Sequence, residues 1–173
     1  ITLDALGGEW RLMADLYALG IQCDTVRFGS ATFLSAGERI RLTGNFMDQG
    51  ELVYSFDDRR DRAGRSGAAA CSHEFWHVFN ASAANTELRA HLRMKLAQVR
   101  YFLEQLDDPE HADANGQTIL ENSMITISTE SGDGRHNDVR RELSGIFHAI
   151  SGGNERFRTG EIIDAGAEGL DLY

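Results

Sequence analysis

The chain has 173 residues, 42% of them hydrophobic and 25% charged, and its 17 Lys and Arg against 27 Asp and Glu give a formal net charge of −10. This composition is typical of a folded domain with one sizeable core, so disorder of the whole chain is excluded. Nucleic acid is not expected as a partner, because phosphate backbones are bound by clustered Lys and Arg. No stretch approaches the roughly twenty apolar residues that span a bilayer.

The first half of the chain predicts a helix, three strands and a loop. A stripe at spacings of three and four predicts a helix that ends near Gly20. The stripe consists of Leu3, Leu6, Trp10, Met13 and Tyr17. β-branched and aromatic residues then predict a strand over residues 25–33, and shorter strands are expected over 39–42 and 52–56. Residues 57–84, which begin charged and continue with small residues, are expected to form an exposed loop region.

The second half is dominated by one long helix, predicted over residues 85–106. Its expected buried face consists of Leu88, Leu92, Leu96, Val99, Leu103 and Leu106. His91, which stands among basic residues of this helix, is expected to face solvent. Residues 123–128 and 146–150 are predicted to be buried strands, and His148 in the second of them is expected to be a hydrogen-bonded core residue.

The order of these elements predicts an α/β fold with a mainly parallel sheet and helices on its faces. We expect residues 25–33, 123–128 and 146–150 to be neighbouring strands of one sheet, with the long helix packed across a face. In such sheets, chemistry lies at the carboxyl ends of the strands. The loop after residues 123–128 carries Glu130, Asp133 and His136, whose side chains are of the types that hold divalent metal ions.

Several segments taken together resemble one protein family. They are residues 103–106, 118–123 (TILENS), 130–137 (ESGDGRHN), 152–153 and 157–160 (FRTG). Their order is similar to the carboxyl-terminal half of the uncharacterised bacterial proteins named for an HxxSHH motif, which themselves resemble the alkaline phosphatase and sulfatase superfamily. The motif corresponds to residues 69–74, where Ser72 and His73 are kept and Ala69 and Glu74 stand in place of histidines.

The resemblance implies an alkaline-phosphatase-like fold, an exported protein (periplasmic or secreted) and metal-dependent hydrolysis of a phosphate or sulfate ester. It implies Glu130 and His136 as catalytic residues that bind a divalent ion such as zinc, with Asp133 third and His73 reaching the ion from the preceding loop. The family's nucleophile and first metal ligands belong to the amino-terminal part of its fold. The chain would then be either a single α/β domain or the carboxyl-terminal part of a larger one. In the second case another polypeptide, such as the amino-terminal half of the same precursor, completes it.

Two alternatives to an ester hydrolase stay open. A non-catalytic binding or structural subunit with a degenerate metal site is favoured by the replacement of two motif histidines. A zinc peptidase is suggested by the sequence HEFWH, in which His73 and His77 would bind zinc on one helix face and Glu74 would act as general base. The extended form of that motif fails, because Asn80 and Ala83 occupy the positions of its Gly and third His.

Overall fold

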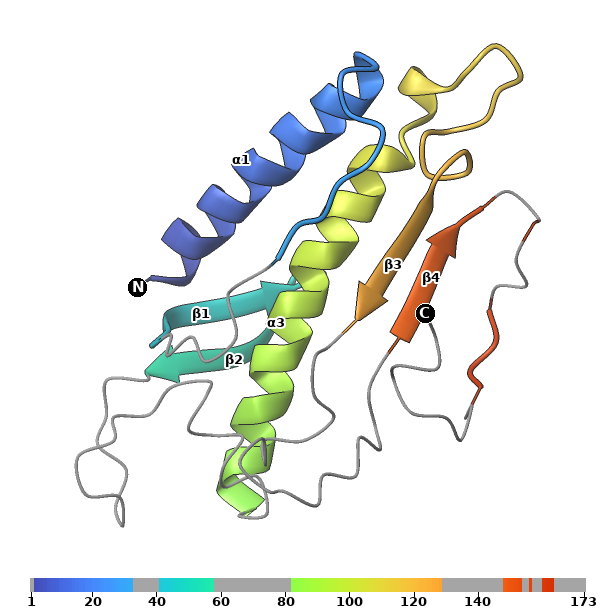
Figure 1. Cartoon of the computed structure of the whole chain (residues 1–173). Helices are drawn as coiled ribbons and strands as arrows, with labels where there is room; N and C mark the ends of the chain where they lie inside the picture. The colour runs from blue at the N-terminus through green and yellow to red at the C-terminus, as the bar shows by residue number, and fades with distance from the viewer. Residues whose placement is uncertain are drawn as a thin grey trace, which may run out of the picture. The chain divides into compact units, whose positions relative to one another are not determined.

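The structure is a computed structural model that describes residues 2–32, 41–57, 82–128, 148–153, 156 and 160–163, without the side chains of residues 82–85. The chain divides into two compact units, Ile1–Gln105 and Leu106–Tyr173, which are described separately. The described elements (Figure 1) are α1 (Leu3–Gln22), β1 (Thr43–Asp48), β2 (Glu51–Asp57), α3 (Ser82–Leu106), η1 (Pro109–His111), β3 (Met124–Ser128) and β4 (His148–Gly152). None of the described helices is both long and apolar enough to cross a membrane.

Helix α1 confirms the helix predicted at the start of the chain and extends two residues beyond Gly20. Its first turn is capped by Thr2, whose hydroxyl oxygen accepts a hydrogen bond from the Ala5 N–H at 3.3 Å. The helix ends where Asp24 takes a left-handed backbone conformation with φ of 55°. Its buried residues are Leu6, Ala14 and Ala18, so the inward face only partly coincides with the predicted stripe, in which Met13 proves to be exposed.

Strands β1 and β2 form an antiparallel hairpin that pairs Thr43 with Asp57 and Asp48 with Glu51. The two-residue turn between them, Gln49 and Gly50, has positive φ at both positions, which is the type I′ geometry that matches the twist of paired strands. The predicted strand over 52–56 lies within β2 and is confirmed. The strand predicted over 39–42 is wrong in its described part, because Arg41 and Leu42 precede β1, which begins at Thr43.

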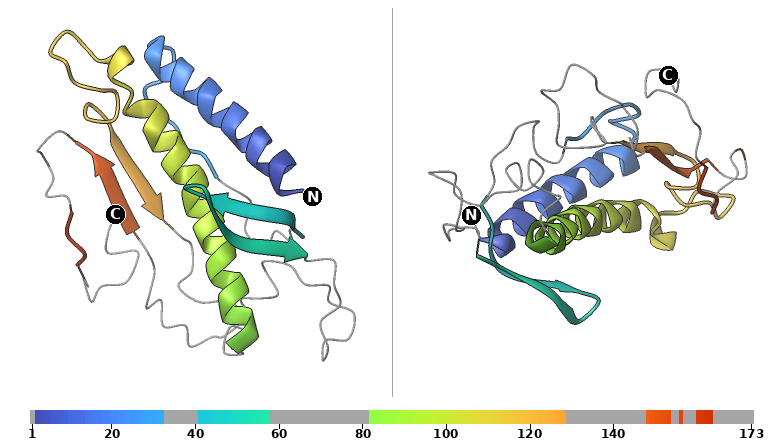
Figure 2. Two further views of the ribbon diagram at one scale, coloured as in Figure 1. Left: turned by 180° about the vertical axis from the view of Figure 1, so that it is seen from behind. Right: turned by 90° about the horizontal axis from the view of Figure 1, so that it is seen from below.

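Helix α3 confirms the long predicted helix, but its predicted buried face is confirmed only in part, at Leu88 and Leu106. Leu92 and Leu96 are 42% and 43% exposed, whereas Ala90, His91 and Met94 are buried. Helices α1 and α3 lie side by side and run in the same direction (Figures 1 and 2). The Trp10 indole N–H donates to the backbone oxygen of Gln98 at 3.0 Å, and the rings of Tyr17 and Phe102 lie 5.7 Å apart.

The hydrophobic core of the amino-terminal unit joins all four of its elements. The hairpin lies across α3, as the views from behind and from below show (Figure 2). The buried core residues are Leu6, Leu42, Phe46, Phe56, Ala90 and Met94. Full burial of a side chain the size of Phe contributes about 1.5–3 kcal/mol, so Phe46 and Phe56, which alternate with exposed neighbours, are major contributors to this packing.

The carboxyl-terminal unit contains η1, a turn region and the hairpin β3–β4. Its strands are antiparallel, with Met124 opposite Gly152 and Ser128 opposite His148. Gly152 has φ of 85°, and a Cβ atom there would overlap the backbone oxygens of Leu120 and Ser123. Only glycine fits this position, because it has no Cβ and adopts positive φ without strain.

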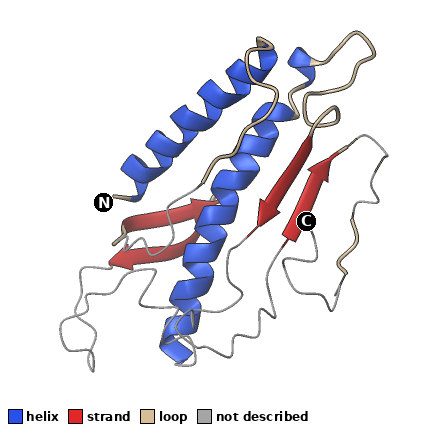
Figure 3. Cartoon of the chain, in the orientation of Figure 1, coloured by secondary structure: helices blue, strands red, loops and turns tan. Residues whose placement is uncertain are grey.

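The predicted α/β fold with a mainly parallel sheet and helices on its faces is wrong, and with it the alkaline-phosphatase-like architecture. The described strands form two separate antiparallel pairs (Figure 3). Of the three segments expected in one sheet, residues 123–128 and 146–150 do overlap neighbouring strands, β3 and β4. Their expected burial is wrong: Met124 and Ile150 are 58% and 50% exposed, and His148 is only partly buried. Residues 25–32 form no strand: the N–H groups of Thr25 and Val26 both donate to Gly20 at the end of α1, and Phe28 is 96% exposed.

Candidate functional site

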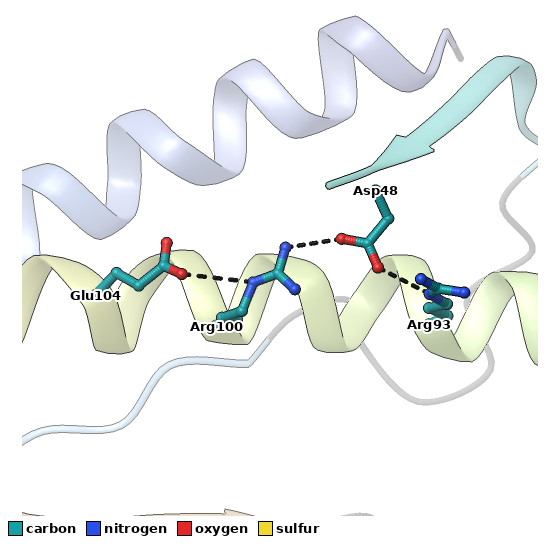
Figure 4. A network of polar contacts seen from close by, with 4 residues as sticks. All are labelled: Asp48, Arg93, Arg100 and Glu104. Atoms are coloured by element: carbon teal, nitrogen blue, oxygen red, sulfur yellow. Dashed lines mark hydrogen bonds and ion pairs between the residues drawn. The ribbon is translucent and has the colours of Figure 1, made fainter. Parts of the chain in front are cut away.

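A polar network joins the first hairpin to α3. Asp48 ends β1 on the same inward face as Phe46, and its carboxylate is only 6% exposed. Its Oδ2 accepts a hydrogen bond from Arg93 Nε, and its Oδ1 accepts one from Arg100 Nη2, both at 2.8 Å (Figure 4). Arg100 Nε also lies 3.5 Å from Glu104 Oε1, one turn along α3.

This network is electrically balanced and serves to hold the fold. The hydrogen bond from Arg100, followed by that from Arg93, lowers the pKa of Asp48 below its ordinary value of 3.8. The same bond raises the pKa of Arg100. Two guanidinium groups face two carboxylates, so no charge is left over to attract a ligand. We assign the network a structural role, which is to pair a buried carboxylate at the tip of the hairpin.

A second polar set lies on the buried face of α3. Glu87 and His91, one turn apart, are 0% and 2% exposed, and Gln98 is also buried. The His91 ring packs against Phe56 with 4.6 Å between the ring centroids. The expectation that His91 faces solvent is therefore wrong, because in the middle of α3 the buried face passes through Ala90, His91 and Met94. Gln98 Oε1 is buried and accepts no hydrogen bond in the described part of the chain.

A pocket of about 300 Å³ lies in the carboxyl-terminal unit. Its walls are Gln117, Glu121, Asn122, Ser123, Gly153 and Arg156, with Met124 as the apolar side chain. One wall is shaped by a reciprocal cap: Glu121 Oε2 accepts from the Thr118 N–H at 2.7 Å, and the Glu121 N–H donates to Thr118 Oγ1 at 3.2 Å. This arrangement is the capping box, which fixes both side chains.

Asp113 fixes the other polar wall of the pocket. Its Oδ1 accepts from the N–H groups of Asn115 at 2.7 Å and Gln117 at 3.0 Å, and its Oδ2 accepts from Asn122 Nδ2 at 3.0 Å. The bonds from Gln117 and then Asn115 lower the pKa of Asp113, because they favour the carboxylate form. Gln117 and Asn122 are thereby held in place by a side chain that does not itself line the pocket.

Arg156 is the only cationic side chain in this wall. Its backbone N–H donates to the Gly153 oxygen at 3.0 Å, which completes a turn after β4. Within the described ranges, its guanidinium forms no ion pair. The pocket therefore combines a cation with amide and carboxylate groups, an arrangement that suits binding of a polar molecule.

The residues predicted to hold a metal all lie outside the described part of the chain. This applies to Glu130, Asp133 and His136, and to His73 and His77, together with Glu74 of the peptidase hypothesis. His148 is described: it begins β4, is partly buried and stands opposite Ser128. Among described residues, no three His, Cys, Asp or Glu side chains gather closely enough to hold a metal ion.

The sequence analysis missed the Asp48 network and the pocket. The alternation of Phe46, Met47 and Asp48 would have placed Asp48 on the inward face, had β1 been predicted at its observed position. The capping box at Thr118 and Glu121 has a sequence signature, Ser or Thr followed three residues later by an acid. Arg156 carries no comparable signal. Comparisons with protein-family models, curated proteins and solved structures found no match.

Proposed function

We propose that the chain is an exported, metal-dependent hydrolase-like protein that acts on a phosphate or sulfate ester, with Glu130 and His136 as the principal ligands. One observation supports this proposal beyond the residue types themselves. Ser128 at the end of β3 stands opposite His148 at the start of β4. Residues 129–147 are therefore the connection between two paired strands, and they contain Glu130, Asp133 and His136 in a single segment. Loops carried on a rigid scaffold are frequent sites of chemistry.

The donor set suits a zinc-like ion. Carboxylate oxygens and imidazole nitrogens are its usual ligands, and an open coordination position can polarise a phosphoryl or sulfuryl oxygen. Glu130, Asp133 and His136 would supply three ligands, with His73 as a fourth. This support comes from the chemistry of the side chains and their order in the chain, and it no longer draws on an alkaline-phosphatase-like fold.

The test combines metal analysis with two chromogenic esters, p-nitrophenyl phosphate and p-nitrophenyl sulfate. We expect a stoichiometric divalent metal in the purified protein. E130Q and H136N should lower hydrolysis by about 100-fold or more, because each removes a ligand of the ion. Matched controls are E110Q and H111N, which change the same residue types in the exposed helix η1. The controls should retain both metal and activity.

Other outcomes select the alternatives. Cleavage of an unstructured protein substrate that is abolished by E74Q and kept in E130Q would identify the zinc peptidase. Protein without stoichiometric metal and without turnover of either ester would identify a non-catalytic binding or structural subunit. The non-catalytic alternative is already favoured by Ala69 and Glu74, which replace two histidines of the motif.

We also propose that another polypeptide covers part of this chain. Leu12, Leu16 and Leu19 lie along one face of α1 at spacings of four and three, and each is more than half exposed. Contiguous exposed apolar surface is typical of protein interfaces. Size-exclusion chromatography with light scattering tests this proposal on the chain coexpressed with its proposed partner, for which the family resemblance implies an amino-terminal half of the same precursor. A stable heteromer that is lost in the L12S/L16S variant is expected. A stable, cooperatively unfolding monomer under the same conditions would contradict it.

A further inference from the structure

The pocket of the carboxyl-terminal unit presents hydrogen-bond donors that no residue of the described chain uses. The Arg156 guanidinium offers up to five N–H donors in a planar fork. The Gln117 side-chain amide and the Ser123 hydroxyl, which also line the pocket, form no hydrogen bond within the described ranges. A guanidinium with neutral donors near it is the usual protein partner of a phosphate or sulfate group, whose oxygens accept several hydrogen bonds at once.

The same pocket also presents acceptors. Glu121 uses one carboxylate oxygen, Oε2, for the cap on Thr118, which leaves Oε1 available. Asn122 donates through Nδ2 to Asp113, so its amide oxygen is the group left for a ligand. These acceptors cannot bind an oxyanion, because a carboxylate and a carbonyl oxygen both repel negative charge. They are suited to the hydroxyl groups of a ligand.

The size of the pocket limits the ligand. About 300 Å³ is at the lower end of the range for small-molecule sites, which corresponds to a molecule of monosaccharide size. Met124 and the backbone at Gly153 supply less polar surface between the donor and acceptor groups. Gly152, whose neighbour forms part of the wall, is fixed by the close approach of the Leu120 and Ser123 backbone. The hairpin end that frames the pocket is therefore rigidly specified.

We propose that this pocket binds a small hydroxylated phosphate or sulfate monoester, with the oxyanion against Arg156 and Gln117 and the hydroxyl groups against Glu121 and Asn122. The inference goes beyond the proposed function, because the pocket lies by Met124 and Gly153, at the end of the β3–β4 hairpin away from Ser128 and His148, which residues 129–147 connect. The inference and the proposed function also involve different residues: Arg156 binds the ester and is not a ligand of the proposed metal ion.

Isothermal titration calorimetry on chelator-treated full-length protein tests the proposal without turnover. The probes are glucose 6-phosphate, inorganic phosphate and glucose. Glucose 6-phosphate should bind about tenfold more tightly than inorganic phosphate, since it uses both sides of the pocket, and glucose should bind most weakly. R156Q should weaken binding of glucose 6-phosphate by about tenfold or more. The control R27Q changes an arginine that is paired with Asp24 in the other unit and should leave binding unchanged.

Equal circular dichroism spectra and melting temperatures of R156Q and the parent protein establish that the fold is kept. Absence of glucose 6-phosphate binding, or equal binding by R156Q, would overturn the proposal. Inorganic phosphate binding as tightly as glucose 6-phosphate would overturn the role of Glu121 and Asn122. Binding without hydrolysis in the metal-loaded protein would leave this inference standing and remove the proposed function.

Discussion

The two units of the chain differ in how far along the sequence their polar contacts reach. In the amino-terminal unit, Asp48 meets Arg93 and Arg100 across 45 and 52 residues, and Trp10 meets Gln98 across 88. In the carboxyl-terminal unit, the hydrogen bonds of Asp113 span only two to nine residues. Polar groups in the first unit therefore hold separate elements together, whereas those in the second shape a loop.

This difference has consequences for stability and for function. Long-range contacts require that the helices and the hairpin have already come together, so the stability of the first unit depends on its core. Local turns persist wherever the adjoining backbone keeps its conformation. A pocket built on local turns is defined mainly by its own loop, and its ligand groups can be altered without disturbing the core of the other unit.

The largest expected effect comes from removing a core side chain of the first unit. F46A should lower the free energy of unfolding by about 3–5 kcal/mol, because it leaves a cavity among α1, α3 and β2. M47A is the matched control: the neighbouring side chain points outward and is 53% exposed, so its loss should cost less than about 0.5 kcal/mol. Urea denaturation followed by circular dichroism measures both. Equal losses would mean that β1 does not present Phe46 to the core.

The second-largest loss of stability is expected in the carboxyl-terminal unit, where two glycine variants distinguish a steric overlap from the strain of a positive φ. G152A should cost about 2–3 kcal/mol, because its methyl group would overlap two backbone oxygens in addition to the strain of positive φ. G116A has a similar φ of 80° with open space around the Cβ position, and it should cost only about 1 kcal/mol.

Amide hydrogen exchange locates these losses. In G152A, protection should fall in β3 and β4 and stay unchanged in α1, because the two regions belong to different units. A uniform loss across the whole chain would contradict the separation of the units. Equal costs for the two glycine variants would contradict the close backbone approach at Gly152.

Local sequence patterns correctly predicted helices and strands whose formation depends mainly on residues close together in the sequence. The helices over 3–20 and 85–106 and the strands over 123–128 and 146–150 were predicted from periodicity and β-branched residues, and each overlaps an observed element. The buried face of α3 was predicted only in part, at Leu88 and Leu106. Leu92 and Leu96 fitted an ideal apolar stripe, but the packing buries Ala90 and Met94, because it is set by the positions of α1 and the hairpin.

Pairing between strands could not be predicted from such patterns. The expected parallel sheet depended on a strand over 25–33, where the chain instead wraps back on the end of α1 through Thr25 and Val26. The ion pairs of Asp48 could not be predicted either, since its two arginine partners are distant in sequence. Glu130, Asp133, His136, His73 and His77 stay predictions, because they lie outside the described residues.

A third, smaller effect tests the long-range polar network of the first unit. At neutral pH, D48N should lower the free energy of unfolding by about 1–2 kcal/mol, since two partly exposed arginines lose the carboxylate they pair with. The pKa of Asp48 is lowered in the folded state. The carboxylate therefore stabilises the fold above its ordinary pKa of 3.8, and this stabilisation is lost as the pH falls through the lower, folded value.

The difference between the parent protein and D48N should accordingly shrink in acid, where Asp48 of the parent becomes protonated. Urea denaturation over a series of pH values measures this change. D24N is the control: Asp24 pairs with Arg27, but both side chains are about 70% exposed and solvent screens the pair, so little change is expected. A difference between parent and D48N that is independent of pH would show that shape at this position matters, and that charge does not.

The smallest effect tests whether α1 and α3 run side by side in the described register. The Tyr101 hydroxyl donates to Asp15 Oδ1 at 2.8 Å, and this bond, followed by burial, raises the pKa of Tyr101 above its ordinary value of 10.0. D15N removes the negative charge that disfavours the phenolate, so the pKa of Tyr101 should move down.

Ultraviolet absorbance of phenolate during an alkaline titration follows the chain's four tyrosines. One of the four should titrate earlier in D15N and at its original pH in D4N, which changes an aspartate in the first turn of α1. Because the pair is exposed, the stability of D15N should fall by less than about 0.5 kcal/mol. Identical titration curves for the parent and D15N would mean that Asp15 does not face Tyr101, and the described register of the two helices would then have to be given up.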